Sequence, residues 1–180
     1  MRKLLNEELE RLDIPDFKEA KKIPVAVVLD NVRSMHNIGS VFRTSDAFRI
    51  DSLLLCGITA VPPNKEIHKT ALGSTESVDW SYYERTEDAI SELKKNAFTI
   101  CSIEQVEGSK LLSEFEIGLD IKYALIFGNE IKGVDQRIVD LSDYCIEIPQ
   151  YGTKHSLNIS VSAGIAVWEF FQKTGSNLFL

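Results

Sequence analysis

Residues 24–30 read PVAVVLD, and residues 31–48 continue as NVRSMHNIGSVFRTSDAF. The first stretch is a short apolar run rich in valine, which is typical of a β-strand that is buried on both faces. The second stretch places Ile38, Val41 and Phe42 at the spacing of one helix face. A buried strand followed directly by an amphipathic helix indicates an α/β fold with parallel strands.

The same alternation continues along the chain after a loop that contains Pro62 and Pro63. Apolar runs and helical periodicity predict strands at 52–57, 97–104, 123–128 and 144–149, and helices at 87–96, 135–142 and 160–173. The expected fold class is therefore α/β, a parallel sheet covered by helices on both faces. No repeat or linker interrupts the pattern, so we expect one domain at 23–180, preceded by a short helical extension at 1–22.

The composition of the 180 residues, 44% hydrophobic and 26% charged, is that of a compact globular domain rather than a disordered, fibrous or membrane-spanning chain. The N-terminal leucines alternate with acids and lack the apolar core of a signal peptide, so we expect a cytoplasmic protein. Cys56, Cys101 and Cys145 lie beside apolar runs, with no CxxC motif and no histidine at metal-ligand spacing. We expect reduced, buried thiols and no metal site.

Charge is distributed unevenly along the chain, whose net charge is −7. Residues 31–75 contain five bases and three acids, a balance of +2, so the other residues together carry −9. The overall charge argues against a protein that coats nucleic acid through bulk electrostatics. An anionic partner would bind near residues 31–75, unless these cations are only a solvated surface.

Polar residues concentrate in three segments that follow predicted strands, at residues 29–44, 126–135 and 148–160. In α/β folds, nucleotide-type ligands bind outside the carboxyl ends of the strands. The chain has no GxGxxG after its first strand and no GxxxxGK[ST] anywhere, which excludes the dinucleotide fingerprint and the P-loop. The ligand site, if these loops form one, must use other residues.

Each loop also has a purely structural interpretation. Gly128 follows a strand, where it either forms a tight turn or lets a ligand approach the backbone. Either Ser156 or Asn158 can cap the last helix, which leaves the other for a ligand. Small residues on that helix favour close packing against another helix: Ser160, Ala163 and Gly164.

Together the three loops resemble the SpoU-type (TrmH-like) family of RNA ribose 2'-O-methyltransferases, within the SPOUT superfamily. The resemblance covers residues 24–172, and the run KTALGSTESV (residues 69–78) looks like the loop that follows the second strand in that family. The residues that match the three motifs of the family are Asn37, Gly39 and Arg43, then Gly128, Glu130 and Gly133, and then Ile148, Pro149, Gly152 and Ser156-Leu157-Asn158.

The resemblance implies a C-terminal deep trefoil knot, which is a rare exception to the rule that protein chains are unknotted. It also implies that S-adenosylmethionine binds in the knotted loops, with Gly128, Ile148 and Leu157 at the cofactor-binding positions. Apolar walls and main-chain polar groups suit an adenine and a methionine tail. The family works as a homodimer that packs through its first and last helices.

The resemblance assigns catalysis to Arg43, with Asn37, Glu130, Ser156 and Asn158 around it. A guanidinium is a poor base near neutral pH. We therefore expect Arg43 to grip the phosphate beside the target ribose and to orient its hydroxyl. The other four residues would hold Arg43 and the nucleotide, with Glu130 pairing the guanidinium; the structural alternatives are a surface carboxylate for Glu130, a helix cap for Asn158 and a salt-bridged arginine for Arg43.

Three cations in or beside the motif loops are expected to contact RNA phosphates: Arg33, Lys132 and Lys154. The RNA is tRNA or rRNA, and a small domain without a separate RNA-reading module favours compact tRNA. Two alternatives stay open, a family member that binds without turnover and an unrelated α/β enzyme that uses a nicotinamide or flavin. The motif residues disfavour the first, and the missing glycine fingerprints disfavour the second.

Overall fold

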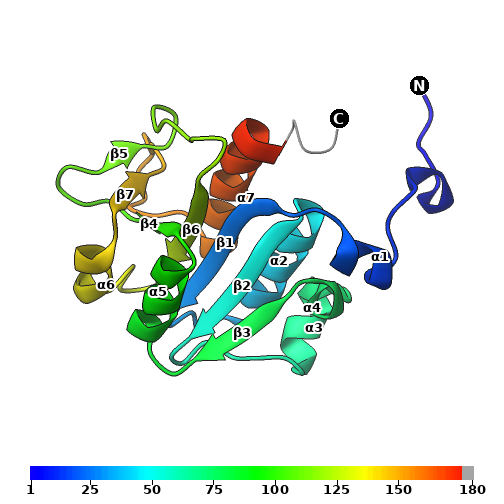
Figure 1. The fold of residues 1–180 in the computed structure, drawn as a ribbon, viewed down its shortest axis with the longest axis horizontal. Helices are drawn as coiled ribbons and strands as arrows, with labels where there is room; N and C mark the ends of the chain where they lie inside the picture. The colour runs from blue at the N-terminus through cyan, green and yellow to red at the C-terminus, as the bar shows by residue number, and fades with distance from the viewer. Residues whose placement is uncertain (176–180) are drawn as a thin grey trace.

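The computed structural model describes residues 1–175 and contains a sheet of seven parallel strands in the order β3-β2-β1-β6-β4-β7-β5 (Figure 1). The strands are β1 (Ile23–Asp30), β2 (Ile50–Cys56), β3 (Trp80–Tyr83), β4 (Phe98–Ile103), β5 (Lys110–Leu111), β6 (Lys122–Phe127) and β7 (Tyr144–Glu147). The predicted parallel sheet is confirmed. All seven strands end at one edge, where the loops that hold the motif residues meet.

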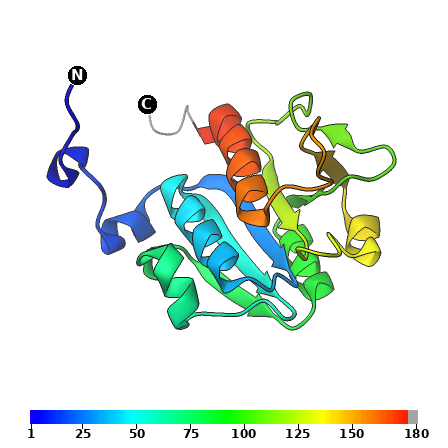
Figure 2. The ribbon, with the colours of Figure 1, turned by 180° about the vertical axis from the view of Figure 1, so that it is seen from behind.

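Helices cover both faces of the sheet, as predicted (Figures 1 and 2). They are α1 (Ile14–Glu19), α2 (Met35–Ala47), α3 (Lys65–Ala71), α4 (Ser74–Ser77), α5 (Thr86–Lys95), α6 (Gln136–Leu141) and α7 (Ile159–Phe170), with a short 3-10 turn η1 (Asn6–Leu9) and a π turn η2 (Phe171–Gly175). Successive strand residues point to opposite faces. In β1, Val25 and Val27 therefore pack with α2 and α7, whereas Ala26 and Val28 pack with α5 and α6.

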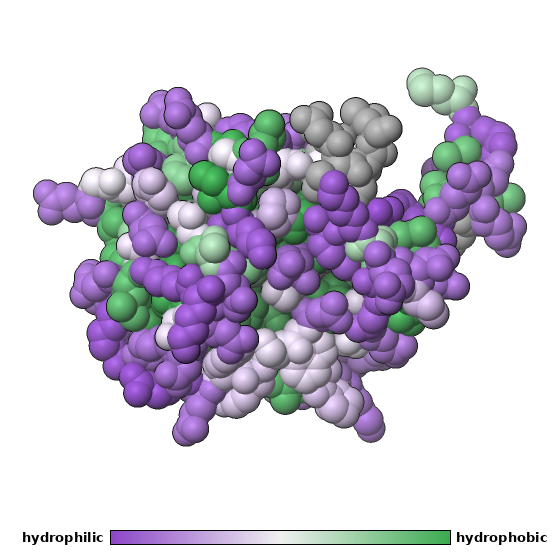
Figure 3. Space-filling model, in the orientation of Figure 1, coloured by the Kyte–Doolittle hydropathy of each residue, from purple (hydrophilic) through white to green (hydrophobic). Residues whose placement is uncertain are grey.

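Helices α2 and α7 lie side by side on one face, with α3 against the far side of α2 (Figure 2). Gly39 permits the close approach of α2 and α3. A Cβ at this position would lie 2.2 Å from Thr70 Oγ1 and 2.3 Å from the Ile67 carbonyl oxygen. The glycine of the first motif is therefore explained by helix packing. The face that carries α5 and α6 is largely hydrophilic at its surface (Figure 3).

The segment between β2 and α5 differs from the sequence-based expectation. Residues 69–78 were expected to form a loop, but most of them belong to α3 and α4. Asn64 caps α3, since its Oδ1 accepts hydrogen bonds from the N–H groups of Glu66 and Ile67. The strands β3 and β5 were not predicted, because runs of four and two residues are too short to show a period.

The N-terminal segment extends away from the sheet before it reaches α1 (Figure 1). It is helical only in η1 and α1, and it attaches through buried Phe17 and an ion pair between Lys18 and Asp79. The division into 1–22 and 23–180 stays a prediction, as does the trefoil knot, and residues 176–180 lie outside the described part of the chain.

Candidate functional site

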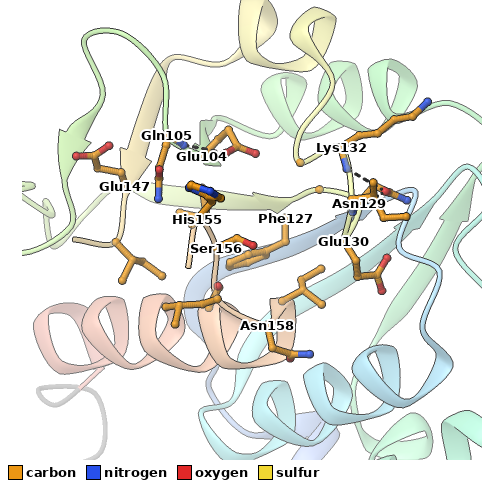
Figure 4. A pocket seen from close by; sticks show the side chains of 18 of the residues that line it. Glu104, Gln105, Phe127, Asn129, Glu130, Lys132, Glu147, His155, Ser156 and Asn158 are labelled. Carbon is orange, nitrogen blue, oxygen red and sulfur yellow. Dashed lines mark hydrogen bonds between the residues drawn. The ribbon is translucent and has the colours of Figure 1, made fainter. Parts of the chain in front are cut away.

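A cavity of about 550 Å³ opens at the carboxyl ends of β4, β6 and β7, beside the start of α7 (Figure 4). Its apolar lining comes from Ile103, Phe127, Ile131, Ile148, Leu157 and Ile159, and its polar lining includes Glu104, Gln105, Asn129, Glu130, Glu147, Ser156, Asn158 and Ser162. The volume is in the range of small-ligand pockets, ~300–1,000 Å³. Apolar walls with carboxylates around them suit a ligand that combines a flat ring with hydroxyl and cationic groups.

The second motif forms a closed loop, residues 128–134, that runs along this cavity. Asn129 and Gly133 exchange backbone hydrogen bonds, with N···O distances of 3.0 and 2.8 Å. A Cβ at Gly128 would lie 2.1 to 2.2 Å from backbone atoms of Gly133 and Val134, and Gly133 has a positive φ of 69°. Gly128 therefore serves first to close the loop, and a bulky residue there would disrupt the loop rather than only fill ligand space.

Two residues that organise this loop were not anticipated from the sequence. Asn129 accepts hydrogen bonds at Oδ1 from the N–H groups of Ile131 and Lys132, and its Nδ2 donates to the Asn31 carbonyl oxygen at 2.8 Å. Glu104 accepts the Val134 N–H at 2.9 Å. An asparagine just after a strand-end glycine is a typical turn residue, so the sequence could have predicted the role of Asn129. It could not have predicted that of Glu104, because the hydrogen-bond partner of Glu104 is 30 residues away.

Glu130 joins the second motif to the first. Its carboxylate accepts hydrogen bonds from the N–H of Arg33 at 3.0 Å, the N–H of Ser34 at 2.9 Å and Asn37 Nδ2 at 3.1 Å. Desolvation by the neighbouring loops raises the pKa of the exposed Glu130 carboxyl, but the hydrogen bonds outweigh it and hold the pKa below its usual value. The predicted pairing of Glu130 with the Arg43 guanidinium is wrong within one chain, because the backbone of the 31–34 segment takes its place.

Asn37 connects this contact to the third motif. Its Oδ1 accepts a hydrogen bond from Asn158 Nδ2 at 3.1 Å. The chain Glu130–Asn37–Asn158 therefore links three loops that are up to 121 residues apart in sequence. Figure 4 shows Asn158 at the start of α7, directed toward α2. The structure brings these three predicted residues together at the rim of the cavity.

Asn158 is the N-cap of α7, since its Oδ1 accepts from the Ser160 N–H at 2.9 Å and from Ser160 Oγ at 2.6 Å. The predicted alternative of a helix cap therefore holds for Asn158, and its amide nitrogen in addition links α7 to Asn37. Ser156 is not the cap and lines the cavity together with Ile148 and Leu157. The surplus of polar groups before α7 is divided between capping and cavity lining.

Arg43 does not line this cavity. It is exposed on α2, and its guanidinium makes no hydrogen bond or ion pair with any residue between Met1 and Gly175. It borders a different cleft, between α2, α4 and the N-terminal segment. The alternative of a salt-bridged structural arginine does not apply within the described chain. The predicted cluster of Arg43 with the other four residues is not formed in a single subunit.

The three cations expected to meet RNA are all exposed, but they do not lie together. Arg33 and Lys132 line one cleft of about 400 Å³ beside the 128–134 loop, and Lys132 lines the cavity as well. Lys132 points away from the cavity in Figure 4. Lys154 lies in the exposed stretch 151–158 and lines neither space.

The cysteines offer no reactive nucleophile. Burial raises the pKa of Cys56 to about 12 and also raises the pKa of Cys101 and of half-buried Cys145. The prediction of a buried thiol is therefore only partly correct for Cys145. Across residues 1–175 no group of three or more His, Cys, Asp or Glu side chains is placed to hold a metal ion, and no helix in that range is long and apolar enough to span a membrane.

Comparison with known proteins identifies relatives along most of the chain. A candidate TrmH family tRNA/rRNA methyltransferase of Staphylococcus aureus strain MSSA476 is 29% identical over 156 residues, which are 87% of this chain and 62% of that protein. The chain thus spans less than two thirds of the length of this relative. A TrmH/SpoU tRNA modifying enzyme of A. aeolicus superposes with a TM-score of 0.76 at 28% identity, covering 87% of this chain and 78% of that one.

The structure of an AdoMet-bound rRNA methyltransferase from Sinorhizobium meliloti superposes with a TM-score of 0.79 at 24% identity, over 87% of this chain and 60% of that one. At this identity the likeness establishes the fold. The family model for the SpoU rRNA Methylase family matches residues 24–168, which include all three hydrogen-bonded motif loops. This chain therefore belongs to the SpoU rRNA Methylase family.

Proposed function

We propose that this protein is an S-adenosylmethionine-dependent RNA methyltransferase that methylates a ribose 2'-hydroxyl of tRNA or rRNA, with tRNA favoured. The observation that carries the proposal is the hydrogen-bonded chain Glu130–Asn37–Asn158 at the rim of the 550 Å³ cavity. Family membership and the names of the relatives support the reaction class. Because tRNA and rRNA are the proposed substrates, we also propose a cytoplasmic location.

The cavity fits the proposed cofactor. Ile148, Leu157 and Phe127 offer apolar contact area for an adenine ring. The ionised carboxylates of Glu104 and Glu147 act only as hydrogen-bond acceptors. They can therefore accept hydrogen bonds from ribose hydroxyls or from an ammonium group. When bound, S-adenosylmethionine supplies a methyl group that its sulfonium has already activated. The residues of the chain then need to bind and orient the two reactants, which can contribute up to ~7–11 kcal/mol.

Arg43 is the group we assign to the RNA substrate. It keeps its charge at neutral pH and can donate two parallel hydrogen bonds to a phosphate. Held beside the target ribose, it would orient the hydroxyl and stabilise charge that develops on the oxygen. Since Arg43 does not reach the cavity of its own chain, a second subunit must bring it there.

A homodimer through α2 and α7 provides this arrangement. On α7 the apolar residues Val161, Ile165 and Trp168 are 39 to 49% exposed, and a Cβ at Gly164 would meet no atom within 4 Å. Helix α7 lies beside α2, whose exposed residue Arg43 would then be at or near the interface. We propose that this face pairs with a second copy and that each cavity uses the Arg43 of the partner.

Mixing two inactive variants tests this arrangement. Arg43→Ala and Glu130→Ala homodimers should each transfer methyl slowly. Heterodimers formed by co-expression have one cavity in which both lesions coincide and one that has both intact residues, so they should recover up to about half of the parental rate. Absence of recovery in a preparation that contains heterodimer would refute the arrangement in trans.

The activity itself is tested by transfer of radiolabelled methyl from S-adenosylmethionine to total RNA that lacks its natural modifications, followed by nucleoside analysis. A 2'-O-methylated nucleoside in tRNA or rRNA is the expected result. Cofactor binding by calorimetry without any transfer would favour a family member that binds without turnover. A protein that neither binds the cofactor nor transfers methyl would refute the proposal.

A further inference from the structure

A second cleft lies on the other side of the 128–134 loop from the cavity. We call it the flank cleft, and it has a volume of about 400 Å³. Its walls come from the segment after β1, the turn after β2 and the outer side of the 128–134 loop. Asn129, Ile131, Lys132 and Gly133 line both spaces, so one short loop separates the flank cleft from the cofactor cavity.

The flank cleft presents two cations, of which Lys132 also interacts electrostatically with Asp135 in the same cleft. Arg33 and Lys132 are exposed, and the side chain of neither makes a hydrogen bond or ion pair within residues 1–175. Many other bases of this acidic chain are paired: Arg2, Lys18, Lys69, Arg85, Lys94, Arg137 and Lys173 all lie within 4.0 Å of a carboxylate. Arg33 and Lys132 are among the bases that have no such pair, and both line this cleft.

The acids of the flank cleft are already engaged. Asp135 accepts from Arg137 Nε at 3.0 Å and Nη2 at 3.2 Å, in a two-pronged ion pair. Asp30 is 2% exposed, and its Oδ1 accepts from Thr86 Oγ1 at 2.6 Å and from Asn31 Nδ2 at 2.8 Å. These carboxylates lose part of their field to their partners, so the charge that the cleft offers to an anion is mainly that of Arg33 and Lys132.

The flank cleft also has apolar side chains. Ile58 is 65% exposed and Ile131 is 77% exposed, and both line it. Isolated exposed isoleucines are ordinary, but two of them beside these two cations form a mixed surface. A flat apolar ring can lie on the isoleucines while an attached anion meets the cations. This combination corresponds to one nucleotide of a polynucleotide, a base joined to a phosphodiester.

We propose that the flank cleft binds one nucleotide of the RNA substrate next to the methylated one, with its phosphate between Arg33 and Lys132 and its base against Ile58 and Ile131. The proposal rests on the proposed function and adds a subsite to it. The target ribose would enter the cavity on one side of the 128–134 loop, and its neighbour would lie on the other side. Lys154 takes no part in this subsite.

The test measures RNA affinity of the double variant Arg33→Gln/Lys132→Gln with a pool of unmodified tRNA transcripts. Each phosphate contact contributes ~0.7–0.9 to the slope of log K against log salt, so the slope should fall by ~1.4–1.8. At 0.1 M salt this corresponds to binding that is ~25- to 60-fold weaker. The melting temperature should stay at its parental value, and so should the calorimetric affinity of the single variant Arg33→Gln for S-adenosylmethionine, because Arg33 does not line the cofactor cavity.

Lys95→Gln/Lys122→Gln is the matched control, because it removes the same charge near the opposite edge of the sheet, at the end of α5 and the start of β6. The variant Ile58→Ser/Ile131→Ser should weaken RNA binding with an unchanged salt slope. The proposed subsite would be refuted if Arg33→Gln/Lys132→Gln keeps the parental RNA affinity and salt slope, or if the control variant loses as much affinity. If the parent protein neither binds RNA nor transfers methyl, the proposed function itself fails, which is a separate outcome.

Discussion

Replacing Glu130 by Gln tests whether the contact between the first two motif loops supports the reaction. The carboxylate accepts hydrogen bonds from three donors, at Oε2 from the Arg33 N–H and at Oε1 from the Ser34 N–H and Asn37 Nδ2. A glutamine has one acceptor oxygen. It can keep the two bonds made at Oε1, but its amide nitrogen then faces the Arg33 N–H as donor against donor.

The size of the effect follows from this geometry. A hydrogen bond to a charged group contributes about 1.5–3 kcal/mol net, and neutral bonds are about half as strong as charge-assisted ones. Glu130 is exposed, so the lower end applies, and the loss of one bond with weakening of two others by half comes to about 3 kcal/mol. If this loss opens the 31–34 segment in the reacting state, methyl transfer falls ~150-fold, since 1.36 kcal/mol is one factor of ten.

Single-turnover transfer with saturating RNA and cofactor measures the rate, and a thermal melt of the same variant measures its folding. Glu107→Gln is the control, because this exposed carboxylate follows β4 and belongs to none of the three motif loops. A folded Glu130→Gln protein that transfers methyl within about threefold of the parental rate would show that the link between the loops has no catalytic role.

Three further predictions concern neighbouring residues. Arg43→Ala should keep its calorimetric cofactor affinity but lose at least ~100-fold in single-turnover methyl transfer, about 2.7 kcal/mol, with poor rescue by Lys because an ammonium lacks the planar fork. Gly39→Ala should lower the unfolding free energy by about 1–3 kcal/mol in denaturant titrations, since its Cβ would lie 2.2 Å from Thr70 Oγ1. Glu130 has a lowered pKa in the folded state, so the stability that its carboxylate contributes is present above the unfolded pKa of about 4.5 and is lost as the pH falls through the folded pKa. The difference in melting temperature between the parent protein and Glu130→Gln should therefore be constant near pH 7 and shrink below pH ~4.

The sequence predicted the sheet because the strands in its centre are long apolar runs. β1, β6 and β4 have six to eight residues each, and their burial is almost complete. It did not predict β3 and β5, whose pairing depends on neighbours in the sheet rather than on their own residues. Helices α3 and α4 were not predicted for a related reason, since seven and four residues are too few to show a clear helical periodicity of apolar residues.

For the site, the sequence indicated which loops meet but not which side chains touch. The structure joins Asn37, Glu130 and Asn158 by hydrogen bonds, whereas their catalytic role stays a prediction. The predicted partner of Glu130 was wrong because two of its three donors are backbone N–H groups, which every residue other than proline has and which the sequence therefore does not reveal. The isolation of Arg43 is a matter of helix face, since six residues separate it from Asn37 and turn it by ~240° around α2.

The proposed binding of RNA by an acidic protein requires that the acids near the site repel phosphate only weakly, and the structure pairs several of them with hydrogen-bond donors. Glu130 and Glu104 accept backbone N–H groups, and Asp135 is paired with Arg137. Each of these carboxylates fixes a loop while its field is partly neutralised by its donors. The remaining negative charge of the chain lies mostly outside residues 31–75, and charges beyond ~10 Å are screened at 0.1 M salt. Attraction to phosphate is then a short-range property of a few exposed cations, so single substitutions at Arg33, Lys132 or Arg43 should matter more than the net charge of −7.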